Sequence, residues 1–518
     1  MRGRHVMRAW LAVAFLWSLA ASGPASAAQA LDPIVYTVRI PSPETQYAEI
    51  EAVVPTGGAD SIELMMPIWS PGYYRVEDYA ARVEELKART LDAVALVTEK
   101  TQKNRWRIAT GGAAVVLLSY RVFCAQRSVT TNWIGADYAV LNGAPTFMTL
   151  AENRRRPHEV RFELPAGWAH AMTVLEPAPG GRANHFRAAD YETLVDSPIL
   201  AGRLAVREFE EAGKKHLVVA AGDYASWDGD AATRDLAAMV AETRRFWGAL
   251  PYERYVFLLA FRPGGGGLEH RNSTLSTVRA NISEATGRWS SLGLISHEYF
   301  HLFNAKRLRP IELGPFDFEK PPTTGSLWIS EGLTSYYGNL ILVRAGLQTA
   351  DAYLASLSSL IGRLQTSPGR LAQSVEQSSR EVWTNSNSGV NPTATTVSYY
   401  NKGAVLGLLL DAKIRRATDG QKSLDDVMRL AYRRYGGDRG FTDPEFLATT
   451  EEVAGVDLKD WFRRFVSSTD ELEYSDVLDL FGLRFASPPD AAEPWTLQVR
   501  TDATAQQKRN LQSWLASR

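Results

Sequence analysis

The chain has 518 residues, of which 45% are hydrophobic and 22% are charged, and its formal net charge is -1. This is an ordinary globular composition, and its balanced charge argues against nucleic acid or an anionic membrane as the main partner. The only cysteine, Cys124, lies in an apolar run, so an intramolecular disulfide is excluded.

The N-terminus has the pattern of a secretory signal peptide, which we assign to residues 1–28. Arg2, Arg4 and Arg8 form a basic start, an apolar run covers residues 9–21, and Ala25-Ser26-Ala27 offers a small-x-small cleavage site. The apolar run is short for a bilayer span, and no later stretch has membrane length. We therefore expect an exported protein, periplasmic or secreted, without a membrane anchor after cleavage.

Residues 31–205 are expected to form an N-terminal antiparallel β domain that resembles a sandwich. Runs rich in Val, Ile, Leu and aromatic residues, separated by Pro, Gly and Asn, are typical of successive strands. The clearest predicted strands cover residues 34–40, 47–54, 61–69 and 115–124.

The pattern changes to alternating helix and strand in a second predicted domain, residues 206–345. Periodicity predicts a helix over residues 231–247 and a strand over residues 255–261, which leads into a run of glycines. A further helix is expected over residues 292–302, and after a loop another begins near Leu327.

Residues 346–480 are predicted to form a helical domain. Helices are expected over residues 400–416 and 456–466, and Ser423 and Thr442 each open a helix with the pattern of a capping box. The remaining residues, 481–518, form a short extension with a Pro-rich joint at residues 487–489, a strand at 495–499 and a final amphipathic helix.

Residues 297–301 read His-Glu-Tyr-Phe-His inside one of these predicted helices. Histidines four residues apart share a helix face, so His297 and His301 can bind one metal ion, and Glu298 can act as a general base toward water that the metal activates. The chain has only 8 histidines, so a chance match is uncommon. The alternative is a helix with two buried, hydrogen-bonded histidines.

A catalytic zinc ion needs a third protein ligand, and two glutamates compete for this role. Glu331 lies in the aromatic-rich helical segment of residues 327–337, whereas Glu319 precedes Lys320-Pro321-Pro322 and is expected on a loop. Because a packed helix holds a ligand more rigidly than a loop, we favour Glu331 over Glu319. Two histidines and a carboxylate favour Zn²⁺.

The chain resembles the glycyl aminopeptidase family of gluzincin metallopeptidases. The resemblance lies in residues 297–307, residues 327–337 and the segment Pro71-Gly72-Tyr73-Tyr74-Arg75. It implies a multidomain α+β architecture with an N-terminal β domain, a thermolysin-like catalytic domain that holds one catalytic Zn²⁺, and a helical domain. Many relatives continue into a PDZ domain, for which the 481–518 extension is too short, so we expect none.

The segment Gly266-Gly267-Leu268-Glu269-His270 is similar to the motif by which these enzymes bind the free amine of a substrate. The resemblance implies that Gly266, Gly267, Glu269 and His270 bind substrate, and that Glu269 pairs with the α-ammonium. Glycines let the backbone of an edge strand approach a peptide closely. Better-known relatives often have asparagine in place of His270, so its role stays open, and a solvated Glu269 beside a glycine turn is the alternative.

Tyr400-Asn401-Lys402-Gly403 resembles the segment that supplies a catalytic tyrosine in the family, so Tyr400 is the candidate to stabilise the oxyanion. The neighbouring Tyr399 is its rival, and a core tyrosine with a satisfied hydroxyl group is the alternative for either.

These expectations together predict a zinc aminopeptidase that acts on peptides, with a preference for small N-terminal residues implied by the family resemblance. Two other functions remain open at this point. A zinc endopeptidase or oligopeptidase would keep the metal site and use Glu269 structurally. A non-catalytic exported binding protein would not need Glu298.

Overall fold

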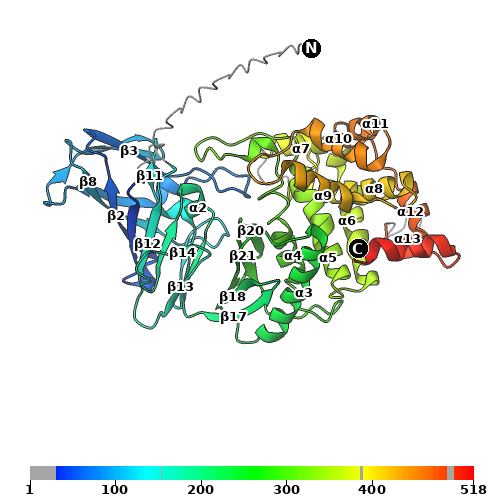
Figure 1. The fold of residues 1–518 in the computed structure, drawn as a ribbon, viewed down its shortest axis with the longest axis horizontal. Helices are drawn as coiled ribbons and strands as arrows, with labels where there is room; N and C mark the ends of the chain where they lie inside the picture. Colours follow the sequence, from blue (N-terminus) through cyan, green and yellow to red (C-terminus); the bar gives the residue numbers. More distant parts are fainter. Residues whose placement is uncertain (1–30, 153, 385–388, 487–494, 518) are drawn as a thin grey trace, which may run out of the picture.

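The computed structural model describes residues 31–152, 154–384, 389–486 and 495–517. The predicted signal peptide and the Pro-rich joint lie outside these ranges. An N-terminal β region lies at one end of the molecule, a five-stranded sheet with helices lies in the middle, and a helical region completes the other end (Figure 1). This confirms the predicted multidomain α+β architecture.

The N-terminal β region contains three sheets whose strands are paired almost entirely antiparallel. Their orders are β14-β15-β12-β1-β2-β8-β4-β5, β13-β16-β10-β9 and β11-β3-β7-β6, and the exception is the parallel pair β1 and β12. The elements of this region are β1 (Ile34–Arg39), β2 (Tyr47–Pro55), β3 (Ser61–Met65), β4 (Val83–Arg89), β5 (Ala95–Leu96), β6 (Thr98–Gln102), β7 (Arg105–Ala109), β8 (Val115–Phe123), β9 (Trp133–Ile134), β10 (Tyr138–Leu141), α1 (Gly143–Thr146), β11 (Thr149–Leu150), β12 (His158–Glu163), β13 (His170–Met172), β14 (Glu176–Pro177), β15 (His185–Ala188), α2 (Tyr191–Val195) and β16 (Ile199–Gly202).

The strand predicted over residues 61–69 is too long, because β3 ends at Met65. Pro67 has no N–H to donate to a ladder, and the chain leaves the sheet there. Trp69 is fully buried, and its indole N–H donates to the carbonyl of Asp317 over 2.9 Å. Trp69 therefore packs against the loop after α4 rather than extending the strand.

The central sheet has the order β17-β18-β19-β21-β20, with parallel strands in its centre and β20 at one edge. Its strands are β17 (Ala205–Glu211), β18 (Lys214–Gly222), β19 (Arg254–Phe261), β20 (Gly266–Glu269) and β21 (Ser273–Val278). Alternate residues of β19 pack on opposite faces: Phe257 joins the core formed with the helices, whereas Leu258 packs with Val140 and Leu200 of the N-terminal region. Both faces are covered, which explains why β19 is apolar and buried from Tyr255 to Phe261.

The individually predicted helices are confirmed, with small changes at their ends: α3 (Gly229–Trp247), α4 (Leu292–Phe300), α5 (Thr334–Arg344), α8 (Tyr399–Ala417), α9 (Leu424–Tyr435), α10 (Asp443–Ala454) and α11 (Lys459–Phe465). The region predicted only as helical also contains α6 (Ala350–Thr366), α7 (Val375–Arg380) and α12 (Ser475–Phe481). Ser423 and Thr442 form the predicted capping boxes with Asp426 and Glu445. Within the described ranges, none of these helices is both long enough and apolar enough to span a bilayer.

The C-terminal extension straps the helical region to the catalytic region. It contains β22 (Leu483–Phe485), β23 (Leu497–Val499) and α13 (Ala505–Leu515), and it buries Trp514 completely. The Trp514 indole stacks on Phe481 at 4.5 Å and donates to the hydroxyl of Tyr336 over 2.8 Å. Beyond the helix, the Ser517 hydroxyl donates to Glu242 of α3 over 2.8 Å.

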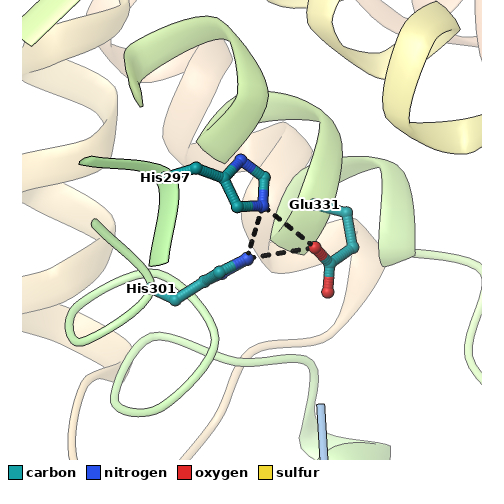
Figure 2. A group of neighbouring side chains, drawn as sticks. All are labelled: His297, His301 and Glu331. Carbon is teal, nitrogen blue, oxygen red and sulfur yellow. Dashed lines mark hydrogen bonds and ion pairs between the residues drawn. The ribbon is translucent and has the colours of Figure 1, made fainter. Parts of the chain in front are cut away.

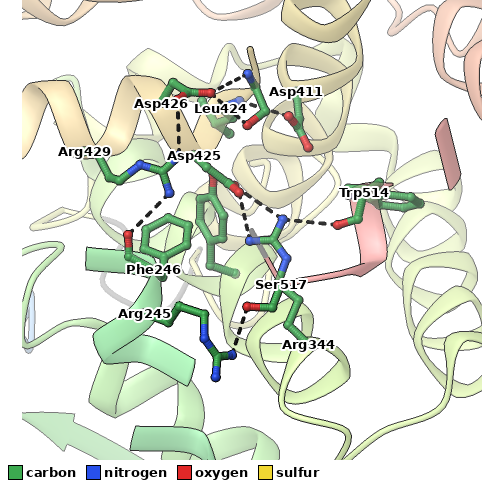
Figure 3. A network of polar contacts seen from close by, with 12 residues as sticks. Arg245, Phe246, Arg344, Asp411, Leu424, Asp425, Asp426, Arg429, Trp514 and Ser517 are labelled. Carbon is green, nitrogen blue, oxygen red and sulfur yellow. Dashed lines mark hydrogen bonds and ion pairs between the residues drawn. The ribbon is translucent and has the colours of Figure 1, made fainter. Parts of the chain in front are cut away.

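A buried ion pair lies beside this strap and joins α5 to α9 (Figure 3). Arg344 contacts Asp425 at 2.9 Å with both side chains 1% exposed, and it also donates to the backbone carbonyl of Trp514 over 3.1 Å. Asp425 accepts a further hydrogen bond from Tyr337 over 3.0 Å. Removing a contact of α13 therefore disturbs groups that pack directly on α5.

Replacing Trp514 by Ala should lower the free energy of unfolding by about 3–5 kcal/mol, because it leaves a cavity against Phe481 and deprives Tyr336 of its donor. Thermal denaturation measures the effect. Gln512→Ala on the exposed face of the same helix is the matched control and should leave the melting temperature unchanged. Equal melting temperatures for both variants would contradict the conclusion that the C-terminal extension stabilises the fold through Trp514.

Candidate active site

The helix α4 carries the predicted metal-binding histidines at its C-terminal end. Its apolar residues Leu292, Ile295 and Tyr299 are buried in the main core, which fixes the helix and turns the opposite face toward the site. His297 lies in the last turn, and His301 is the C-capping residue with helical backbone angles. The helix is thus slightly shorter than predicted, but both imidazoles keep the spacing that lets them converge.

Glu331 comes from a π-helical segment, η4 (Trp328–Leu333), which runs directly into α5. Gly332 lies so close to α8 that a Cβ added there would be 2.5 Å from the Cα of Gly403. A side chain at either glycine would therefore push η4 and α8 apart. Single π-helical turns are frequent at functional sites, and this one determines where Glu331 points.

His297, His301 and Glu331 bring three ligand atoms together (Figure 2). The Nε2 atoms of the two histidines are 3.0 Å apart, and Glu331 Oε2 is 3.0 Å from His301 Nε2 and 3.7 Å from His297 Nε2. The side chains of His301 and Glu331 are almost fully buried, whereas that of His297 is 19% exposed.

Asn304 orients His301 and the segment that carries Glu331 through hydrogen bonds. The Nδ1 of His301 donates to the backbone carbonyl of Asn304 over 2.9 Å, which leaves the lone pair of Nε2 facing the site. The side-chain amide of Asn304 donates to the carbonyls of Ile329 and Ser330, over 2.8 and 3.1 Å. One buried asparagine therefore joins the loop after α4 to the segment that carries Glu331.

These residues fit a zinc ion. Glu331 Oε1 is buried without a hydrogen-bond partner among the described residues. Burial alone would lower the pKa of His301, but Glu331, Glu269 and Glu298 raise it to about 10, so the surroundings favour positive charge at this point. Two nitrogens about 3 Å apart match the spacing that zinc–nitrogen bonds of about 2.0–2.1 Å allow, and the donor set suits Zn²⁺.

Glu319, the other candidate ligand, lies elsewhere. Its carboxylate forms an ion pair with Arg105 at 2.6 Å and accepts a hydrogen bond from the side chain of Asn104 over 2.8 Å. Both partners belong to the N-terminal β region, so Glu319 joins that region to the loop after α4 rather than contributing to the ligand cluster.

Glu298 lies directly against the edge strand β20. A Cβ added at Gly267 would overlap the carboxylate of Glu298, so the absence of a side chain at Gly267 makes room for it. Burial raises the pKa of Glu298 well above its ordinary value; His301 opposes this, while Glu269 and Glu331 add to it. A carboxylate that holds a proton more tightly than an exposed glutamate is suited to accept one during a reaction.

Glu269, at the end of β20, faces the same space. Oxygen atoms of Glu269 and Glu298 and a nitrogen of His301 all lie within 4.8 Å of one another. Burial raises the pKa of Glu269 to about 7, although His301 and Lys306 counteract it. A cationic group placed here would stabilise the charged carboxylate. A Cβ at Gly72 would overlap Glu269, so a loop of the N-terminal region covers this carboxylate.

Tyr400 lies beside the first ligand, with ring centroids of Tyr400 and His297 6.3 Å apart. Tyr399 is buried and instead packs so closely on Gly389 that a Cβ there would be 2.7 Å from its hydroxyl oxygen. Burial raises the pKa of the Tyr400 phenol well above 10, and Glu331 and Tyr399 add to this. The phenol is therefore a hydrogen-bond donor that stays protonated.

The other two residues of the predicted substrate motif lie differently. Gly266 has φ 118°, and a Cβ there would meet nothing within 4 Å, so the strand is open on that side. His270 is buried and points to Asp196, with 3.2 Å between its Nδ1 and the carboxylate.

Sequence reasoning missed three polar residues near the site. Asp196 and Tyr74 come from the N-terminal region, and Lys306 follows the second histidine. Tyr74 is buried in the core of the catalytic region, and burial together with the charges of Glu331 and Glu269 raises its pKa. Tyr74 and Lys306 lie in segments that carry the family resemblance, and this resemblance could have pointed to them. No pattern in the sequence pointed to Asp196.

Comparison with known proteins places these residues in recognised domains. Residues 35–203 match the model of the Peptidase M61 N-terminal domain, and residues 290–406 match that of the M61 glycyl aminopeptidase. No curated protein matches the chain by sequence.

Solved structures share the fold. An aminopeptidase N family protein from Idiomarina loihiensis is 27% identical with a TM-score of 0.83, and the alignment covers 91% of this chain and 82% of that one. A variant M1 zinc metallopeptidase from Deinococcus radiodurans, bound to a Tyr-Ser-Ala substrate, is 15% identical with a TM-score of 0.52, covering 86% of this chain and 95% of that one. The second likeness concerns the fold alone.

Replacing Gly267 by Ala should lower kcat by about 10²-fold while zinc content stays unchanged, because the new methyl group displaces the side chain of Glu298. Peptidase assays and metal analysis measure the two effects. Gly265→Ala is the control, since a Cβ there meets nothing within 4 Å. Full activity of the Gly267 variant would show that Glu298 does not need its position against β20.

Proposed function

Because this chain belongs to the M61 glycyl aminopeptidase family and is a zinc metalloaminopeptidase, we propose that it releases small residues, glycine and alanine, from the N-termini of peptides. The name of the matched family supports the substrate preference. We further propose that it acts in the periplasm or outside the cell, which the basic and apolar pattern of residues 1–28 supports.

The position of Glu269 carries this proposal. Its carboxylate lies within 4.8 Å of a nitrogen of His301. The α-nitrogen of a peptide is only two bonds, of about 1.46 Å and about 1.52 Å, from the carbonyl carbon of the first peptide bond. An α-ammonium group paired with Glu269 therefore brings the first peptide bond of a substrate, and no later one, to the metal ligands. This geometry favours an aminopeptidase over an endopeptidase.

His297, His301 and Glu331 would hold the zinc ion. When bound, it polarises the carbonyl of the scissile peptide bond and acidifies water beside it. Glu298 takes a proton from the attacking water and transfers it to the nitrogen of the leaving amine. The hydroxyl of Tyr400 donates a hydrogen bond to the oxygen that becomes negatively charged, and Glu269 holds the ammonium group throughout.

The test of the function is hydrolysis of glycyl- and alanyl-p-nitroanilide beside their N-acetylated forms, with and without a chelator. We expect chelator-sensitive cleavage of the free-amine substrates only, because the acetylated substrates lack the charge that pairs with Glu269. Cleavage of the acetylated forms would indicate an endopeptidase. Failure to cleave any substrate while zinc is bound would indicate a binding protein.

Replacing Glu298 by Gln should lower kcat by about 10³-fold or more, because the amide cannot accept the proton, while zinc remains bound. Steady-state kinetics and metal analysis of the same preparation measure both effects. Glu312→Gln, which changes an exposed glutamate, should behave as the unmodified enzyme. Retention of most activity in the Glu298 variant would remove its assigned role.

A further inference from the structure

A charged cluster joins the N-terminal β region to the residues that follow Glu269. Asp196 follows α2 of the N-terminal region, and its carboxylate accepts three hydrogen bonds from the catalytic region. The donors are the ammonium of Lys306 at 2.7 Å, the imidazole of His270 at 3.2 Å and the backbone amide of Arg271 at 2.7 Å.

Two of these donors belong to the turn that connects β20 to β21. Glu269 is the last residue of β20, and the amide of His270 donates to the carbonyl of Ser273 to close the turn. Asp196 therefore fixes the two residues directly after Glu269, one by its side chain and one by its backbone. Asp196, which belongs to the N-terminal β region, therefore restricts rotation of the end of β20. This also restricts the direction of the Glu269 side chain.

The third donor links the same carboxylate to the metal ligands. The backbone amide of Lys306 donates to the carbonyl of His301 over 3.0 Å. Ala305, directly before it, has φ 114°, a conformation that a residue with a side chain rarely adopts. The next residue, Lys306, reaches Asp196, and its positive charge also attracts Glu269.

Burying this charged cluster carries a desolvation penalty. The side chains of His270, Lys306 and Asp196 are only 4%, 7% and 14% exposed, and His270 Nε2 is buried without a partner among the described residues. Apolar side chains of similar size often stabilise a fold as well as a buried ion pair does. The buried Asp196 cluster is therefore better explained by the position in which it holds the end of β20 than by a contribution to folding stability.

We propose that Asp196 is a positioning residue of the amine subsite, acting through His270, Arg271 and Lys306 to hold Glu269 toward the α-ammonium of the substrate. The N-terminal β region thereby takes part in recognising the free amine, although Asp196 itself touches no substrate. This inference rests on the proposed role of Glu269.

The test compares two zinc-binding ligands that differ only in the amine, glycine hydroxamate and acetohydroxamate. Isothermal titration of the zinc-loaded full chain gives the ratio of their dissociation constants, which measures the amine subsite without requiring turnover. In the unmodified enzyme we expect glycine hydroxamate to bind more tightly. Asp196→Asn, which keeps the shape but removes the charge, should reduce this ratio about tenfold and leave acetohydroxamate binding unchanged.

Three further variants make the result specific. Lys306→Met removes the ammonium that pairs with Asp196, and it should reduce the ratio as Asp196→Asn does. Glu269→Gln should abolish the preference, and adding Asp196→Asn to it should change nothing more, because Asp196 acts through Glu269. Asp190→Asn makes the same change at the N-cap of the same helix α2, where the side chain accepts from the Thr193 amide over 2.7 Å, and should keep the full ratio.

The outcomes separate the inference from the proposed function. No preference for glycine hydroxamate in the unmodified enzyme would overturn the role of Glu269, and the inference with it. A preference that survives in Asp196→Asn would overturn the inference alone. Equal weakening of both ligands in Asp196→Asn would also overturn it, since that result indicates a structural role rather than control of the amine subsite.

Discussion

The active site depends on the contacts of Asn304. The metal ligands come from α4 and η4, which a long loop separates along the chain, and Asn304 joins the two by bonding to His301 and to the carbonyls of Ile329 and Ser330. An asparagine amide donates two hydrogen bonds from one nitrogen, which a carboxylate of the same size cannot do. Because Asn304 is fully buried, water does not compete for these bonds, and the relative position of the ligands is fixed before a metal binds.

Around the histidines the protein buries three carboxylates. They differ in how far neighbouring positive charges offset the effect of burial on the pKa. Glu331 faces two imidazoles, which hold its pKa at about 2 even though burial alone would raise it. At Glu298 burial outweighs the opposing effect of His301, and Glu269 and Glu331 add to it, so the pKa rises. Glu269 lies between these extremes, with His301 and Lys306 partly opposing burial. The different surroundings of the same side chain suit the three glutamates to the three roles that we propose for them, as metal ligand, proton acceptor and partner of an ammonium group.

Local patterns in the sequence predicted what local physics determines. Periodicity identified α3, the capping-box patterns marked the starts of α9 and α10, and the spacing of the histidines placed both on one helix. The aromatic-rich helical pattern around Glu331 favoured it over Glu319, which precedes two prolines. The π-helical turn was not predicted, because it depends on the contact between Gly332 and Gly403, which are distant in sequence. The end of β3 was missed because hydrophobic residues that bind another domain look the same as residues of a strand.

The residues missed by sequence reasoning share a location at the boundary between the N-terminal region and the catalytic region. A general base and three ligands can be assembled within one domain, as α4 and η4 are here. Recognition of a free amine requires more, because the space beyond the first residue of the substrate must be closed. In this protein the closure comes from the other domain: Gly72 packs on Glu269, and Tyr74 is buried among residues of the catalytic core. The N-terminal region therefore does more than stabilise the fold, because it also encloses Glu269, the carboxylate that we propose binds the free amine.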